Sequence, residues 1–124
     1  MVDYTANDLR TINNYASMDE TAIEAFMDGV ISHINSETGA SLAHFRDDTV
    51  NADGSKVVSI TEAQEPAFLA GAALMMRAYS DKGPNTAIAG QSLTAITTDP
   101  HYAVWTRVFR EAVRRLRGRS FERV

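Results

Sequence analysis

The chain has 124 residues, of which 44% are hydrophobic and 23% are charged, a composition typical of one folded domain and not of a disordered chain. It contains no cysteine, which excludes disulfides and thiolate metal sites. The net charge of −4 is unevenly distributed: residues 101–124 hold seven arginines and two glutamates, a net of +5, whereas residues 1–100 hold five basic and fourteen acidic residues, a net of −9. An acidic body joined to a basic C-terminal segment indicates a docking function for that segment.

Two helices are predicted in the N-terminal third of the chain. A short one begins at the capping residue Thr5 and stops near Tyr15. Ser17 and Glu20 then have the spacing of a capping box, which favours the start of a second helix. This helix is predicted over residues 18–37, because apolar side chains recur in it at three- and four-residue steps: Ile23, Phe26, Met27, Val30, Ile31 and Ile34. Its expected C-cap is Gly39.

Residues 40–60 lack the helical period. Asp53 and Gly54 form a turn signal between Thr49-Val50 and Val57-Val58, a pattern typical of a short β-hairpin. The acidic residues around this turn indicate that it is exposed.

A third helix is predicted near residues 65–80, starting from Thr61 or a neighbour and with Pro66 in its first turn. Its apolar face contains Phe68, Leu69, Ala72, Met75, Met76 and Tyr79. Four other residues are small enough to let a second helix approach closely: Ala70, Gly71, Ala73 and Ala78. We therefore expect this segment to be the central helix of the core.

Residues 81–98 are predicted to be a second irregular region. The glycine and proline at 83 and 84 break the helix, and two short runs at 86–88 and 94–96 flank Gly90 and Gln91 in the pattern of a second hairpin. An irregular connection of this length inside a compact domain is usually functional.

The last helix is predicted to open at Asp99-Pro100, an N-cap followed by a proline in the first turn. One face is apolar: Trp105, Val108, Phe109, Ala112, Val113 and Leu116. Another face is basic: Arg107, Arg110, Arg114 and Arg117. Gly118 is expected to end the helix, with a basic tail after it.

These elements predict an all-α fold, a small bundle of about four helices with two long irregular loops that can hold short β-hairpins, and an extended basic C-terminal tail. Residues 1–117 would form the helical domain and residues 118–124 a docking tail.

The sequence gives no support for catalysis or for a cofactor. The histidines at 33, 44 and 101 stand in no metal-ligand pattern, and the acidic turn around Asp47, Asp48 and Asp53 lacks the ligand order of a calcium loop. No apolar run approaches the roughly 18 residues of a membrane span. We therefore expect a non-enzymatic soluble protein, made in the cytoplasm.

From residue 60 onward the order of elements is familiar. An alanine-rich helix, AFLAGAALMMRAY from Ala67 to Tyr79, precedes a glycine-containing segment and then Thr98-Asp99-Pro100, which opens an amphipathic helix with a basic end. This order resembles the head-tail connector, or adaptor, proteins of tailed bacteriophages. The short entry helix and the long amphipathic helix before it fit the same family.

The resemblance implies a structural virion protein at the head-tail interface, assembled as a ring, commonly of twelve copies, beneath the portal protein. Genomic DNA would pass through the ring without sequence-specific binding, and neither a membrane nor a cofactor is implied. The residues that would dock on the portal are Arg114, Arg115, Arg117, Arg119, Phe121 and Arg123. The loops at 47–56 and 82–97 would contact neighbouring copies or the tail-proximal stopper or tail-completion protein, through Asp47, Asp48, Asp53, Lys56, Asn85 and Gln91.

A nucleic-acid-binding helical module is the alternative function. In that case the arginine face of the last helix would follow the phosphates. The acidic body argues against it, as does the scarcity of side chains other than arginine that could read base edges. The arginines could also contact the acidic body of a neighbouring copy.

Overall fold

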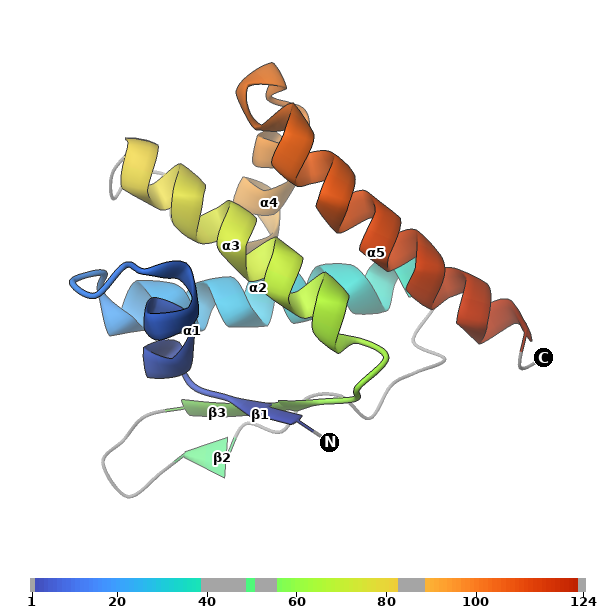
Figure 1. The fold of residues 1–124 in the computed structure, drawn as a ribbon, viewed down its shortest axis with the longest axis horizontal. Helices are drawn as coiled ribbons and strands as arrows, with labels where there is room; N and C mark the ends of the chain where they lie inside the picture. Colours follow the sequence, from blue (N-terminus) through green and yellow to red (C-terminus); the bar gives the residue numbers. More distant parts are fainter. Residues whose placement is uncertain (1, 39–48, 51–55, 83–88, 123–124) are drawn as a thin grey trace.

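The computed structural model describes residues 2–38, 49–50, 56–82 and 89–122, and in them the chain forms five α-helices, one 3-10 helix and a three-stranded antiparallel sheet (Figure 1). The elements are, in order, β1 (Val2–Tyr4), α1 (Ala6–Asn13), α2 (Glu20–Thr38), β2 (Thr49–Val50), β3 (Lys56–Ile60), α3 (Glu65–Lys82), α4 (Ala89–Thr97), the 3-10 helix η2 (Pro100–Tyr102) and α5 (Ala103–Glu122). The predicted small helical bundle with a short hairpin is confirmed. No helix in the described ranges is long and apolar enough to cross a membrane.

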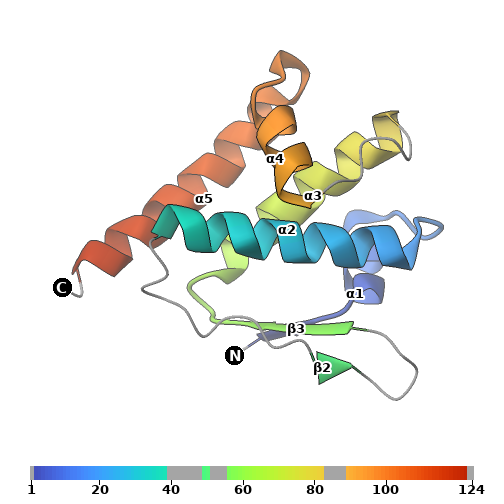
Figure 2. The same ribbon diagram turned by 180° about the vertical axis from the view of Figure 1, so that it is seen from behind.

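The helices pack in crossed layers around one core. Helix α2 runs across α3 and α5, and α4 packs against α2 on the rear face (Figures 1 and 2). The sheet lies below this bundle, near the start of the chain. The largest fully buried side chains come from α2, α3, η2 and α5, namely Phe26, Phe68, Tyr102 and Phe109.

The first helix is capped as predicted. The Thr5 N–H donates to the Asp8 carboxylate at 2.9 Å, and the Asp8 N–H donates to the Thr5 hydroxyl at 3.3 Å. The helix ends at Asn13, and its C-cap is Asn14, whose φ of 61° lies in the left-handed region that asparagine tolerates.

The prediction of a second capping box, from Ser17 to Glu20, was wrong. Ser17 lies in a turn, and α2 begins only at Glu20. The reason is that the preceding residues are held against α1: Met18 is buried, and its carbonyl accepts a hydrogen bond from Arg10 Nε at 2.9 Å. The body of the predicted helix is confirmed, while its expected C-cap, Gly39, lies outside the described residues.

The predicted hairpin is confirmed as the antiparallel pair β2–β3, in which Thr49 faces Val57. Its turn at Asp53-Gly54 lies outside the described residues. Strand β1 was not predicted, because three residues are too few to show an alternating pattern; it pairs with the other edge of β3.

Tyr4 ties the sheet to the first turn of α3. Its hydroxyl donates to the Glu65 carboxylate at 2.5 Å, and its ring lies 5.5 Å from that of Phe68. Burial, followed by the contact with Glu65, raises the pKa of Tyr4 to about 12.

Helix α3 begins as predicted, after a capping turn. The Thr61 N–H donates to the Gln64 side-chain oxygen at 3.0 Å, and the Gln64 N–H donates to the Thr61 hydroxyl at 3.2 Å. Pro66 follows in the first turn of the helix.

The prediction of an irregular region through residue 98 was wrong, because residues 89–97 form helix α4. Gly90 and the β-branched residues of this segment have low helix propensity, which favoured the hairpin prediction. Tertiary packing overrides that propensity: Leu93 and Ile96 are one turn apart and almost completely buried, and α4 packs against α2.

The orientation of α5 also differs from the prediction. Phe109, Val113 and Leu116 are buried as expected, but the side chains of Trp105 and Val108 are 45% and 55% exposed. The helix does not end at Gly118 but continues to Glu122, so the expected extended tail is helical over most of its length. A glycine inside a helix costs only about 1 kcal/mol, which is too little to end a long helix by itself.

Candidate functional site

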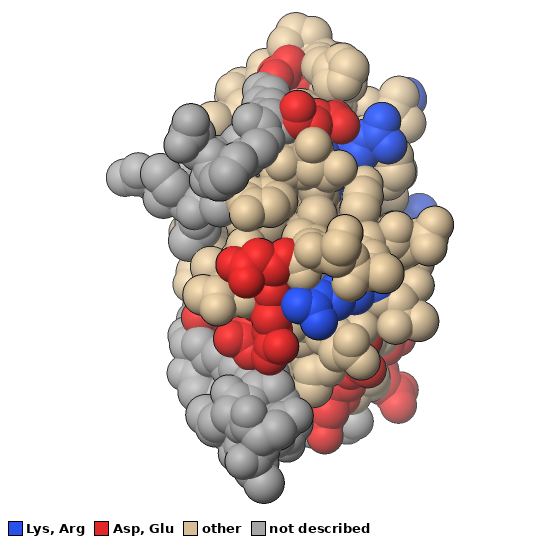
Figure 3. Space-filling view, turned by 90° about the vertical axis from the view of Figure 1, so that its left-hand side faces the viewer, with Lys and Arg blue, Asp and Glu red and all other residues tan. Residues whose placement is uncertain are grey.

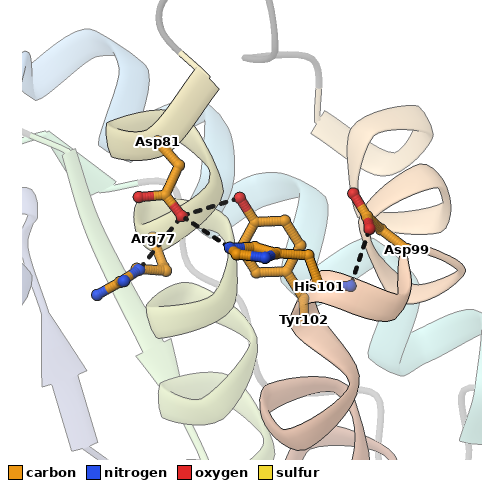
Figure 4. A network of polar contacts seen from close by, with 5 residues as sticks. All are labelled: Arg77, Asp81, Asp99, His101 and Tyr102. Atoms are coloured by element: carbon orange, nitrogen blue, oxygen red, sulfur yellow. Dashed lines mark hydrogen bonds and ion pairs between the residues drawn. The ribbon is translucent and has the colours of Figure 1, made fainter.

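Helix α5 is fixed at its start by a polar network with the end of α3 (Figure 4). The Asp81 carboxylate accepts a hydrogen bond from the Tyr102 hydroxyl at 3.0 Å, and the same oxygen lies 3.3 Å from Arg77 Nε and 3.8 Å from His101 Nε2. Asp99 caps η2 by accepting from the His101 N–H at 3.0 Å. Burial, and then Asp81, raise the pKa of Tyr102. The position of α5 on the body is therefore well defined.

Two of the four arginines on the predicted basic face hold α5 to the rest of the fold. Arg110 Nη2 donates to the Thr97 carbonyl at 3.1 Å, at the end of α4. Arg117 Nε donates to the Glu37 carbonyl at 3.0 Å near the end of α2, and Arg117 also forms an ion pair with the Glu37 carboxylate. A cation is favoured at the C-terminal end of a helix, so both contacts stabilise the fold.

Three other arginines of α5 are exposed and have no ion pair or hydrogen bond to a side chain or carbonyl among the described residues: Arg107, Arg114 and Arg115. We call them the outer arginines. Glu111 lies in the same groove as Arg107 and Arg114 but forms no ion pair with them in the described part of the fold. The outer arginines are therefore available to an external anionic group.

Two adjoining grooves lie along this side of α5. The first, of about 260 Å³, is lined by residues that include His33, Arg110 and Arg114. The second, of about 440 Å³, shares Arg110 and Arg114 with it and also includes Thr106. Thr106 is 3% exposed, and its hydroxyl has no hydrogen-bond partner in the described structure. Arginines outnumber the acidic residues in both grooves, which are Glu37 in the first and Asp99 and Glu111 in the second. A partly concave surface with a net positive charge fits acidic side chains of a partner.

His33 forms the α2 side of the first groove. It is half-buried, and its ring lies 5.4 Å from that of Phe109. Burial lowers the pKa of His33 below its ordinary value of 6.5; Glu37 opposes this effect, and Arg110 adds to it.

The lowered pKa of His33 predicts that the fold loses stability in mild acid. As the pH falls below 6.5, His33 is protonated in the unfolded chain before it is protonated in the folded protein, because its pKa is lower in the folded state. Proton uptake therefore favours the unfolded chain, and the free energy of unfolding decreases until the pH reaches the pKa of His33 in the folded protein. Denaturant unfolding at about pH 7.5 and pH 5.5 measures this difference. In the variant His33→Gln the difference should be smaller, and an equal difference in both proteins would contradict the prediction.

A second outward surface of α5 is apolar. Val104 and Val108 are 62% and 55% exposed, and together with Trp105 they face Ala70 and Ala73 of α3 across a shallow pocket of about 340 Å³. We call these five residues the apolar patch. The apolar pattern of the sequence predicted that Trp105 and Val108 are buried in the core, and Val104 was not part of that predicted face. A usable signal was present, because the apolar positions of α5 span too much of the helix circumference for one buried stripe.

The structure does not bring the sequence-predicted site residues into one site. Arg114 and Arg115 are exposed on α5, whereas Arg117 is paired with Glu37. Arg119 and Phe121 lie in the helical backbone of α5, but their side chains are outside what the structure describes. Lys56 begins β3 and Gln91 lies in α4. The remaining candidates lie outside the described residues: Asp47, Asp48, Asp53, Asn85 and Arg123.

Acidic side chains gather on one side of the molecule, with some basic side chains among them (Figure 3). Figure 3 shows the side on which α2 begins and α3 ends, where groups of acidic side chains reach the surface. Exposed acids in α1 and just before α2 include Asp8 and Asp19. The C-terminal end of α5 lies on the opposite side of the bundle (Figure 1), and Arg114 and Arg115 are exposed in the second half of this helix.

The fold and these surfaces define a small helical protein with a sheet at one edge and two outward faces on its last helix. The described residues contain no group of three side chains able to hold a metal ion. No family model, curated protein or solved structure matches this chain.

Proposed function

We propose that this protein is a structural assembly protein, a head-tail connector that forms a ring and joins the portal protein of a tailed bacteriophage to the tail-proximal proteins. The observation that carries the proposal is the set of outer arginines. They are exposed and form no ion pair within the described structure, on a helix fixed to the body by Arg110, Arg117 and the Asp81 network. A rigid helix with free cations is suited to docking on an acidic surface of another protein.

The distribution of charge supports assembly of several copies. Groups of acidic side chains reach the surface where α2 begins and α3 ends (Figure 3), and the C-terminal end of α5 lies on the opposite side of the bundle (Figure 1). The acidic groups of one copy can therefore meet Arg114 and Arg115 of another. Contacts between two different surfaces are heterologous, and they close into a ring when the rotation between copies permits.

The alternative, a nucleic-acid-binding module, is less well supported. Arg110 and Arg117 are already bound within the fold, which leaves three described arginines on α5 for phosphates. Three phosphate contacts would give a salt dependence with a slope of only about −2.7, whereas proteins that bind the DNA backbone tightly make roughly six to ten such contacts.

Charge reversal of the outer arginines tests the proposal. The variant Arg107→Glu/Arg114→Glu/Arg115→Glu should bind a purified portal ring of the same virus at least about tenfold more weakly, since each exposed ion pair contributes up to about 1 kcal/mol. The matched control replaces the same residues with lysine and should retain most of the binding. Circular dichroism checks that both variants are folded.

Two outcomes would contradict the docking function. One is unchanged portal binding after charge reversal. The other is salt-sensitive binding to duplex DNA that is lost in the glutamate variant, which would favour the nucleic-acid alternative.

A further inference from the structure

The apolar patch is the largest group of exposed apolar side chains on the described surface. The described part of the chain exposes four large hydrophobic residues, and three of them belong to the patch: Val104, Trp105 and Val108, which lie within five consecutive positions of α5. They surround a pocket whose α3 wall is Ala70 and Ala73. A concentrated apolar patch with a pocket in it is typical of a protein interaction site.

The fourth exposed large hydrophobic residue is Ile12 of α1, with 53% of its surface exposed. Helix α1 packs against α2 and α3, on the other side of α3 from α5 (Figure 1). Ile12 therefore cannot fill the patch of its own chain, but it can fill the patch of another.

The charges around the two surfaces are complementary. Asp8 is exposed one helical turn before Ile12. Arg107 directly precedes Val108, and Arg115 follows it by two turns, so both cations border the patch on α5. Complementary charges beside an apolar contact fix its register and exclude wrong partners.

We propose that the apolar patch of one copy receives Ile12 and the surrounding face of α1 from a second copy of this chain. This inference rests on the proposed function and identifies the contact between neighbouring copies in the ring. The isoleucine side chain enters the pocket beside Trp105, and Asp8 lies against the arginines at its edge. Since the two surfaces are different, each copy still offers a free α1 face and a free patch, and the contact is heterologous.

The chain contains one tryptophan, so Trp105 reports occupation of the patch directly. Sedimentation velocity and tryptophan emission are followed as the protein is concentrated to about 1 mM, the range in which weak contacts form. The wild-type protein should sediment as species larger than a monomer, and its emission should shift to shorter wavelength as Trp105 leaves water.

Two variants separate the surfaces. Val108→Asp places a charge in the patch, and Ile12→Asp removes the apolar side chain that fills it; each should weaken self-association at least about tenfold, as expected when a central apolar anchor is lost. Ile12→Ala is a milder second variant in case the aspartate disturbs α1, and circular dichroism checks each fold. An equal mixture of Val108→Asp and Ile12→Asp should form a dimer and nothing larger, because only one intact α1 face and one intact patch meet.

Several results would overturn the inference. A wild-type protein that remains monomeric with unchanged emission at the highest concentration would do so. Self-association that is lost in Val108→Asp but kept in both Ile12 variants would show that the patch binds another patch. If self-association fails while the portal ring is still bound, only this inference fails; if self-association occurs but portal binding is absent, the proposed function fails instead.

Discussion

Replacement of Gly71 by alanine is expected to lower the free energy of unfolding by about 2 kcal/mol, despite the better helix propensity of alanine. Gly71 lies where α3 crosses both α2 and α5. A Cβ atom at this position would be 2.7 Å from Val30 Cγ1 and 2.8 Å from Phe109 Cε1, closer than nonbonded carbons can come. Overpacking of this kind costs up to about 3 kcal/mol, and the gain in helix propensity returns about 1 kcal/mol.

Denaturant unfolding of Gly71→Ala measures this effect, and a compensating variant identifies its cause. In the wild-type background Val30→Ala removes buried atoms and should destabilise the protein. In the Gly71→Ala background it should cost much less, because it also removes one of the two clashes. Equal costs in both backgrounds would mean that the added methyl group does not meet Val30.

Two adjacent residues of α5 are expected to respond very differently to alanine. Phe109 is fully buried between α3 and His33, whereas Val108 is 55% exposed. Phe109→Ala should therefore lower the free energy of unfolding by about 3–5 kcal/mol, which is a large part of the total stability of a small domain. Val108→Ala should change it by no more than about 0.5 kcal/mol.

The pair tests the orientation of α5, because each variant serves as the control for the other. Thermal or denaturant unfolding of the two proteins under the same conditions is sufficient. Similar losses from both variants would mean that Val108 belongs to the core, as the sequence pattern alone suggested, and that the apolar patch does not exist.

Local signals in the sequence predicted most of the helices correctly. The capping pair Thr5 and Asp8, the apolar stripe of α2 and the proline at the start of α3 are short-range features, and each determines its element with little help from the rest of the fold. The small residues of α3 also predicted a close helix approach, which the structure places at Gly71.

The errors occurred where tertiary contacts decide the structure. Helix α4 has weak helix-forming residues and is held by burial of Leu93 and Ile96 against its neighbours. The rotation of α5 could not be deduced from its own sequence, since Phe109 and Trp105 are both aromatic and only the neighbouring helices determine which one is covered. The contacts of the arginines could not be deduced from the local sequence either. No periodicity indicates that Arg117 contacts Glu37, which is 80 residues away in the chain.

The structure separates the residues of α5 that hold the fold together from those that are exposed, which the sequence pattern alone did not do. One face of the helix belongs to the core, and Arg110 and Arg117 attach the helix to α4 and α2. The outer arginines and the apolar patch remain for other molecules. Under the proposed function, docking on the portal protein falls to Arg107, Arg114 and Arg115 rather than to the whole basic face. Arg107 and Arg115 also border the apolar patch proposed to contact a second copy.

Electron cryo-microscopy of purified phage particles that were assembled with this protein present tests the proposed connector function by locating the protein in the particle. We expect a ring of copies beneath the portal, with the outer arginines of α5 against the portal protein. A particle without this protein, or a ring in which α5 points away from the portal, would rule out the connector function.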